Sequence, residues 1–251
     1  MIKVKNYLID CGAMFKRSFK LTIRSPEAVF VSAFLPAAMM WLFVSVFGNM
    51  FHVNFIMPAI LILSIGQSAS SVALSVNIDI NKGIVDRFLS MPIYRSSILF
   101  AQSLTQLLKS AVACAIVIGV AFALGYRTEA GALQWMGGLG LVLLITFALT
   151  WLFILLGMSV KSTEVAGLLM VPPMILPYLS TGFTSAEGMS RGLAWFATHQ
   201  PLTPMIESLR SLFLGAPVAN YHIFPAIAWC IGIIAFSFIM CSVLLYRRTK
   251  K

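Results

Sequence analysis

Charged side chains are scarce in this sequence, since Asp, Glu, Lys and Arg together make up only 10% of its 251 residues. A soluble domain is about 25% charged, because its surface faces water. Hydrophobic residues account for 59% of the chain, and its mean hydropathy is +0.92. This composition excludes both a soluble globule and a disordered chain. It predicts an all-α integral membrane protein with a single transmembrane domain over residues 1–251.

Cysteine and catalytic motifs are also scarce. Three of the four cysteines, Cys114, Cys230 and Cys241, lie in apolar runs, where packing is a more plausible role than a disulfide. The chain has no Walker A, zinc-protease or serine-nucleophile motif, and its three histidines are far apart in sequence. We therefore expect no catalytic residue, no metal and no directly bound cofactor.

Long runs without Asp, Glu, Lys or Arg predict the membrane spans, and the longest is residues 28–78. A helix needs about 20 apolar residues to cross a bilayer, so this run is predicted to hold two spans. Lys109 is expected near the cytoplasmic end of the third span, and three prolines interrupt the fifth. The six predicted spans are about 28–48, 56–77, 103–126, 136–157, 165–186 and 224–245.

Lysine and arginine mark the ends of these spans rather than one folded face, which argues against nucleic-acid binding. With the N-terminus inside, fifteen of the 18 lysines and arginines lie on the cytoplasmic side. Both termini are therefore predicted to be cytoplasmic in the inner membrane. The segment 1–27 is expected to lie on the inner membrane face, 246–251 to form a basic tail, and 184–222 to form short outer-leaflet helices between spans 5 and 6.

The second span carries a polar face. Five polar residues lie on one side of this helix because they are three or four positions apart. They are Ser64, Gln67, Ser68, Ser71 and Ser75. Two interpretations stay open, and they are compatible. The face either packs closely against other helices through hydrogen bonds, or it lines a translocation path or a dimer interface.

The loop after span 2 is the densest mixed-charge stretch of the chain, with Asp79, Lys82, Asp86, Arg87 and Arg95. Gly83 allows a turn and Pro92 ends a helix, so a short amphipathic helix is predicted at about 84–91. It would present Ile84, Phe88 and Leu89 beside its charges. The segment is either an ordinary solvated loop or a docking surface for a partner, and the mixture of charge and aromatic residues favours docking.

This loop resembles the cytoplasmic loop of the type-2 ABC exporter permeases, which has Gly, an acidic–Arg pair, then Pro followed by Arg. Those positions here are Gly83, Asp86, Arg87, Pro92 and Arg95. A second resemblance covers 183–215. Its matching residues are Phe183, Met189, Trp195, Pro201, Arg210 and Gly215, with departures at Ser190 and Gln200. In the order and spacing of these motifs, the chain most resembles the daunorubicin-resistance-like drug permeases. The Nod-factor and polysaccharide export permeases share the same arrangement of spans and motifs.

The resemblance implies a permease subunit that pairs as a dimer, most simply a homodimer, with a separate ABC ATPase subunit that binds ATP-Mg. It implies a coupling segment consisting of Gly83, Asp86, Arg87, Phe88, Pro92 and Arg95. It also implies an outer segment that includes Trp195, Pro201, Glu207 and Arg210. The expected cargo is a hydrophobic or amphipathic molecule, a drug, lipid or glycoconjugate, moved outward along spans 2 and 5.

The main alternative is a secondary transporter or channel without an ATPase partner. Such proteins usually carry acidic residues inside their spans, whereas all eight acidic residues here fall at span ends or in loops. In that case, the backbone carbonyls near Pro172, Pro173 and Pro177 are the groups that would bind ions. A membrane-embedded enzyme is a further alternative, but the sequence shows none of the convergent His, Asp or Cys residues that such an enzyme needs. An assembly or immunity protein that does not transport is another alternative.

Overall fold

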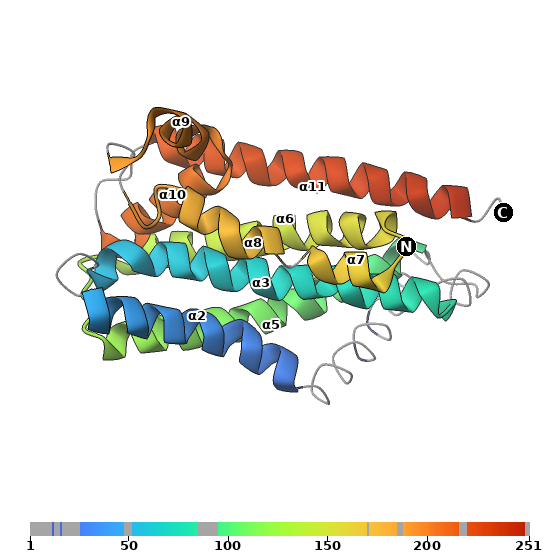
Figure 1. Ribbon diagram of the computed structural model, residues 1–251, viewed down its shortest axis with the longest axis horizontal. Coiled ribbons are helices and arrows are strands. Elements are labelled where there is room, and N and C mark those ends of the chain that lie inside the picture. Colours follow the sequence, from blue (N-terminus) through green and yellow to red (C-terminus); the bar gives the residue numbers. More distant parts are fainter. Residues whose placement is uncertain are drawn as a thin grey trace.

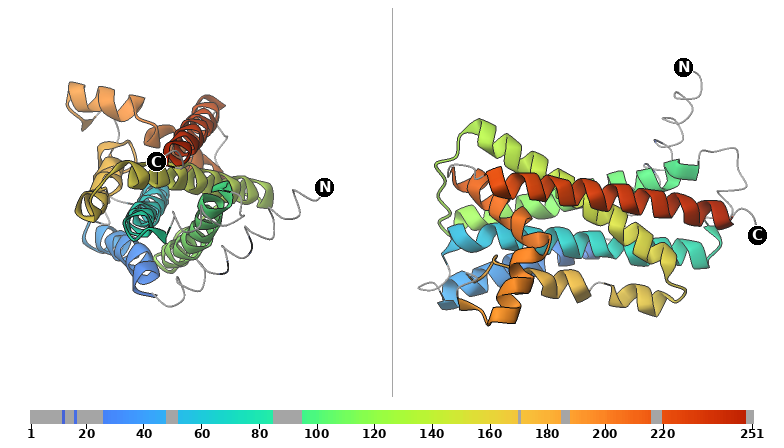
Figure 2. Two further views of the ribbon diagram at one scale, coloured as in Figure 1. Left: turned by 90° about the vertical axis from the view of Figure 1, so that its right-hand side faces the viewer. Right: turned by 90° about the horizontal axis from the view of Figure 1, so that it is seen from above.

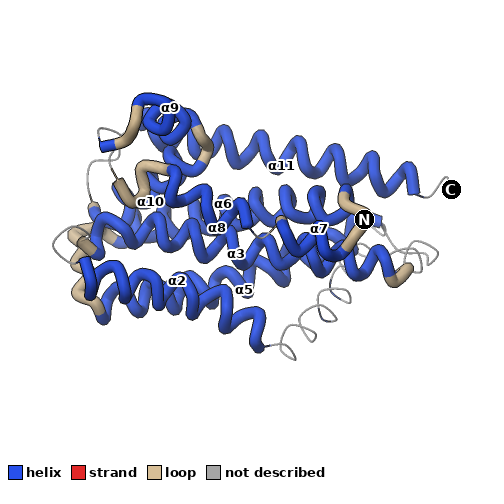
Figure 3. Tube along the Cα trace, viewed as in Figure 1, coloured by secondary structure: helices blue, strands red, loops and turns tan. Residues whose placement is uncertain are grey.

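The computed structural model describes residues 26–47, 52–84, 95–169, 171–184, 188–215 and 220–248, together with Gly12 and Lys16. Within these ranges every regular element is a helix (Figure 3). The elements are α2 (Pro26–Phe47), α3 (Val53–Asn81), α5 (Arg95–Ala123), α6 (Ala132–Ser159), α7 (Thr163–Leu168), α8 (Val171–Ile175), η1 (Leu176–Leu179), α9 (Arg191–His199), α10 (Leu202–Leu214) and α11 (Asn220–Arg248). The all-α prediction is confirmed for this part of the chain.

The five long helices run along the same axis of the molecule, with α3 at the centre (Figures 1 and 2). Helix α3 packs against α2, α5, α6, α7, α8 and α10. Its apolar residues surround the helix instead of forming one stripe, which is the pattern of a helix buried on all sides. Small residues allow the close approach, since a Cβ at Gly157 of α6 would lie 2.8 Å from the Cα of Ala73.

Four helices are long and apolar enough to cross a membrane, by length and composition: Val53–Asn81, Leu99–Ala123, Ala132–Ser159 and His222–Tyr246. Two shorter apolar stretches, Ala33–Val46 and Thr163–Leu179, coincide with the predicted first and fifth spans. The chain is thus a helical membrane protein, while the six-span topology stays a prediction. The expected inner-face helix lies outside the described residues, apart from Gly12 and Lys16.

Two expectations about the spans need correction. Helix α5 begins at Arg95 rather than near Ser103, so Lys109 lies in the middle of the helix and not near its end. Its side chain is partly buried, and the bundle therefore accommodates a cation that a lipid-facing position would disfavour. The fifth span ends as helix at Leu179 rather than near residue 186, and its prolines divide it into α7, α8 and η1.

The predicted short helices between the fifth and sixth spans are α9 and α10. Helix α9 lies across the long helices at one end of the bundle, as the views in Figures 1 and 2 agree. Helix α10 packs against α3, α6 and α11. Its residues Met205, Ile206, Leu209 and Phe213 are fully buried. It is therefore part of the core rather than a helix that only rests on the bundle.

Candidate functional site

The predicted coupling segment begins at a well-defined turn. Helix α3 ends at Asn81, and the next residues bond back to it, with Lys82 N donating to Ile78 O and Gly83 N to Ile80 O, each at 3.0 Å. Gly83 has φ +68°, a left-handed conformation that costs other residues about 1–2 kcal/mol. The predicted turn at Gly83 is thus confirmed.

The rest of the coupling segment lies outside the described residues, namely Asp86, Arg87, Phe88 and Pro92. Arg95 is the first residue of α5, although its side chain is not described. The end of α3 lies at the same end of the bundle as the end of α6 and the C-terminal end of α11 (Figure 1). The mixed-charge stretch therefore leaves and re-enters the bundle where several helices end together.

Two asparagines that sequence reasoning missed tie the end of α3 to the α6–α7 turn. Asn77 Nδ2 donates to Gly157 O at 3.1 Å and to Val160 O at 2.7 Å. Asn81 Nδ2 donates to Asn77 Oδ1 at 2.9 Å and to Lys161 O at 3.3 Å. Asn77 is fully buried. Two amide side chains four residues apart at the end of a predicted span were the available signal.

The predicted polar face of α3 divides into a buried part and a partly exposed part. Ser64 and Ser68 are buried, Gln67 and Ser71 are partly buried, and Ser75 is exposed. Ser68 Oγ accepts a hydrogen bond from Gln106 Nε2 of α5 at 2.5 Å. This interhelical bond confirms helix packing for Ser68. A path or dimer interface along the whole face, Ser64, Gln67, Ser68, Ser71 and Ser75, stays a prediction, since packing and such an interface are compatible.

The outer-segment residues Glu207 and Arg210 form a compact polar cluster on α10. Arg210 Nη1 lies 2.6 Å from Glu207 Oε1, which also accepts a bond from Thr181 Oγ1 at 2.9 Å. Arg210 Nη2 donates to Phe55 O and to Gly182 O, each at 3.1 Å. Its guanidinium also stacks 3.8 Å from the centre of the Phe55 ring. One cation thus joins α10, the start of α3 and the turn after η1.

The other two outer-segment residues lie apart from this cluster. Trp195 is exposed on α9 and stacks on His199, with ring centroids 4.7 Å apart. Pro201 occupies the N-cap position of α10, where its fixed φ suits the start of a helix. The structure therefore brings together Glu207 and Arg210, but not all four residues.

The loop between α5 and α6 holds the C-terminal end of α10. Tyr126 Oη and Thr128 Oγ1 both donate to Phe213 O, at 2.8 and 2.5 Å. Tyr126 is 1% exposed, and its burial raises its pKa to about 12. The same loop reaches α3, because Asn54 Oδ1 accepts from Arg127 N at 3.2 Å. The C-terminal end of α10 is thereby fixed to the α5–α6 loop and, through that loop, to the start of α3.

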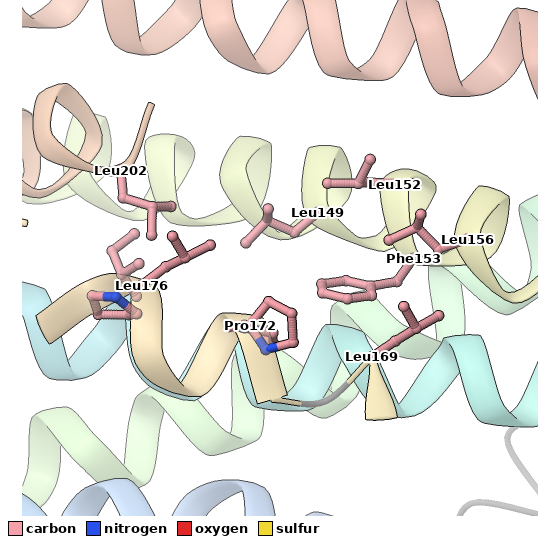
Figure 4. A pocket seen from close by; sticks show the side chains of 12 residues that line it. Leu149, Leu152, Phe153, Leu156, Leu169, Pro172, Leu176 and Leu202 are labelled. Carbon is pink, nitrogen blue, oxygen red and sulfur yellow. The ribbon is translucent and has the colours of Figure 1, made fainter. Parts of the chain in front are cut away.

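The proline-broken fifth segment encloses a cavity of about 140 Å³ against α3 and α6. A Cβ at Gly66 of α3 would lie 2.9 Å from Pro173 Cβ, so glycine permits this contact. Figure 4 shows leucines of α6 facing Pro172 and Leu176 across the cavity. Among the described residues that line it there is no Asp, Glu, Lys, Arg or His.

Within the described residues, no group of three His, Cys, Asp or Glu side chains is placed to hold a metal ion. The three described cysteines are free and buried, as packing residues would be. Long apolar helices around a buried central helix, with polar groups joining helix ends, define a multi-pass membrane protein. The described polar groups supply mechanical connections between helices.

Comparison with known proteins gives the family. Residues 10–214 match the ABC-2 type transporter family, and the chain belongs to it. It is 25% identical over 188 residues to the daunorubicin resistance ABC transporter permease protein DrrB1 of Streptomyces coeruleorubidus, which covers 72% of this chain and 66% of that protein. It is 23% identical over 198 residues to the probable doxorubicin resistance ABC transporter permease protein DrrC of Mycobacterium tuberculosis (strain CDC 1551 / Oshkosh), covering 78% and 70%. The chain thus spans about two thirds of the length of these relatives.

Proposed function

We propose that this chain is the permease subunit of an ATP-driven exporter that moves a hydrophobic or amphipathic molecule outward. The family membership supports a permease, and the names of the relatives, which are drug-resistance permeases, support drug export. A separate ATPase subunit that binds ATP-Mg supplies the energy. A second copy of the chain completes the transporter.

The observation that carries this proposal is the connection between the coupling segment and the central helix. The segment emerges directly from α3 at Gly83, and α3 packs against seven other described elements. Asn77 and Asn81 join the same end to the α6–α7 turn. A displacement of residues 82–94 would therefore shift α3 and the end of α6 together, because packed helices move as bodies.

The proposed orientation in the membrane follows from the distribution of lysine and arginine. The coupling segment, the N-terminal segment and the basic tail face the cytoplasm, where the ATPase binds. The polar face of α3 and the proline-broken fifth segment line the route. All six spans, including Ala33–Val46 and Thr163–Leu179, cross the membrane in this arrangement.

The test is loss of coupling without loss of folding. Asp86→Ala and Arg87→Ala should each lower co-purification of the ATPase and ATP-dependent transport in vesicles. Truncating one member of a buried charged pair at an interface costs about 2–5 kcal/mol, and each 1.4 kcal/mol is about tenfold in affinity. Lys161→Ala is the matched control, because Lys161 is an exposed cation at the same end of the bundle.

Wild-type binding and transport by both variants would exclude this segment as the coupling element. ATP-independent transport that follows a proton or sodium gradient would instead support the secondary-transporter alternative. Membrane insertion and a single monodisperse peak from each variant are required before either result is interpreted.

A further inference from the structure

Lys109 is a cation inside a helix that is long and apolar enough to cross the membrane. It lies about 15 Å from the start of the apolar stretch Leu99–Ala123 and about 21 Å from its end, at about 1.5 Å per residue. Both distances exceed the reach of a lysine side chain, so its ammonium group stays within the hydrocarbon region when this helix spans the bilayer. An ionisable residue at such a depth is costly and usually marks a functional site.

The charge of Lys109 has no counter-ion nearby in this chain. Its side chain makes no ion pair or hydrogen bond with the residues that the structure describes. Asp79 of α3 lies about two helical turns nearer the start of α5, where it accepts a bond from Gln102 Nε2 at 3.3 Å. All eight acidic residues fall at span ends or in loops, and a second copy related by an axis along the membrane normal would hold them at the same depths. The counter-ion therefore comes from another molecule.

Lys109 lies on the side of α5 that faces α2. Gln102 and Ile116 are each about two full turns away from it, so all three residues share one side of the helix. Ile116 lines a cavity between α2 and α5, which lie side by side (Figure 1). Lys109 is partly buried, whereas Leu108 and Val112 beside it are 43% and 51% exposed. Its position is thus at the edge between the bundle and the bilayer.

The cavity next to Lys109, called here the α2–α5 cavity, measures about 500 Å³. This volume falls within the range of about 300–1,000 Å³ typical of small-molecule sites. Its described lining is aliphatic and aromatic, and consists of Ala33, Phe34, Ala37, Ala38, Trp41, Ile116 and Val120. Trp41 and Ile116 are 59% and 43% exposed on the outside of the bundle. The cavity therefore opens sideways to the bilayer and suits a hydrocarbon chain.

We infer that Lys109 and the α2–α5 cavity bind a long-chain carboxylate taken up from the bilayer. The carboxylate pairs with Lys109 Nζ, and the acyl chain lies along α5 past Ile116, about 10 Å further along the helix axis. A neutral lipid would leave the ammonium group unpaired, and a small soluble anion would leave the cavity empty. This site goes beyond the proposed function, because it depends on α5 crossing the membrane and not on export.

The experiment is photolabelling of the full chain in nanodiscs of zwitterionic lipid, buffered so that the fatty acid is ionised. The probe is a long-chain fatty acid with a diazirine in its chain, and its methyl ester and its alcohol serve as neutral comparisons. The acid should label residues 33–41 and 116–120, as mapped by mass spectrometry. Labelling by both comparisons should be about tenfold weaker, which corresponds to about 1.4 kcal/mol.

Lys109→Met should lower labelling by the acid about tenfold, to the level of the ester, because it removes the charge and keeps a long side chain. Lysine is the costly residue inside a span, so membrane insertion of this variant should not suffer. Lys109→Arg should retain the labelling, since a guanidinium also pairs with a carboxylate. Lys161→Met is the matched control, because it removes an exposed cation that does not line the cavity.

Ala38→Phe should fill the cavity and block labelling by every probe, since Ala38 lines it and is partly buried. Leu42→Phe is its control, because Leu42 lies on the same helix and is 42% exposed. Equal labelling by the acid and its ester, or labelling that Lys109→Met leaves unchanged, would overturn the inference. So would labelling by the acid that appears only in Glu27→Gln, because Glu27, the second residue of α2, would then be the native counter-ion. The comparison of probes on the wild-type chain decides the matter even if a variant fails to fold, and it requires neither ATPase nor ATP.

Discussion

Arg210 has a greater structural role than any other described cation. Its guanidinium bonds to three segments and stacks on Phe55, while Glu207 balances its charge. The planar fork of arginine makes these contacts simultaneously, which a lysine cannot do. The side chains of the pair are 12% and 23% exposed, so solvent screens them only in part.

We predict that Arg210→Ala lowers the free energy of unfolding by about 2 kcal/mol, since hydrogen bonds to charged groups are worth about 1.5–3 kcal/mol each. This corresponds to a fall of about 4–8 °C in melting temperature for a chain of this size. The measurement is thermal unfolding in nanodiscs. Arg210→Lys should lose most of the same stability, whereas Arg191→Ala on exposed α9 should change little. Equal melting temperatures for Arg210→Ala and Arg191→Ala would contradict this role.

Burial of Tyr126 predicts that the free energy of unfolding falls at alkaline pH. Its pKa is raised from 10.0 to about 12 by burial. A raised folded-state pKa contributes stability that is complete below pH 10.0 and is lost as pH rises toward 12. The difference in stability between wild type and Tyr126→Phe should therefore shrink across this window. A constant difference from pH 9 to about 12 would show that the Tyr126 hydroxyl has the same pKa in the folded and unfolded chain, so that burial does not raise it.

At the scale of single residues, the sequence indicated Glu207 and Arg210 through a family resemblance but not their partners. Those partners are backbone carbonyls of Phe55, Thr181 and Gly182, and a carbonyl has no sequence signature. Asn77 was missed for a related reason. Its acceptors lie 80 and 83 residues further along the chain, so no local pattern reveals the bond.

At the scale of elements, the contact between α3 and α6 depends on the absence of a side chain. A Cβ at Gly157 would clash with Ala73 O, and it would lie 2.9 Å from Ala73 C. These are backbone atoms, which cannot rotate away as a flexible side chain can. Helix α6 also contains Gly140, where a Cβ would meet nothing within 4 Å.

We predict that Gly157→Ala destabilises the bundle by about 1–3 kcal/mol through overpacking. Gly140→Ala should be neutral or slightly stabilising, since alanine favours helix over glycine by about 1 kcal/mol. Melting temperatures of the two variants in the same detergent measure the difference. If both variants melt alike, the close approach of α3 and α6 is not required for stability.

The elements themselves were largely predictable, because apolar length and prolines act locally. The runs at 56–77, 136–157 and 224–245 all proved helical, and the prolines divided the fifth span. The start of the third helix was predicted too late in the chain, because a charged residue such as Lys109 usually marks the end of a span. Lys109 is partly buried by neighbouring helices, and the sequence of one span does not reveal which helices pack against it.

At the scale of the whole molecule, the distribution of basic residues predicts one orientation. The exposed residues Lys161 and Ser190 lie after α6 and before α9 respectively, on what the proposed topology makes opposite sides of the membrane. The bias of lysine and arginine toward the cytoplasm is the physical basis of this assignment. It sets the side on which an ATPase would bind.

We predict that a cysteine at position 190 reacts with an impermeant maleimide in intact cells, whereas one at position 161 reacts only after permeabilisation. The background would have Cys11, Cys114, Cys230 and Cys241 replaced by alanine. Labelling of position 161 alone in intact cells would reverse the topology. It would also place the coupling segment outside, which excludes a cytoplasmic ATPase as its partner.

The central position of α3 has a consequence for biogenesis. Synthesis proceeds from the N-terminus, so α3 leaves the ribosome before α5 and α6 exist. Ser68 and Asn77 then have neither Gln106 nor the carbonyls of Gly157 and Val160 to bond. Until those helices arrive, the polar groups of α3 must be accommodated by the insertion machinery or by lipid headgroups. Defects in α5 or α6 should therefore appear first as failed maturation of α3, with degradation of the nascent chain preceding any loss of transport.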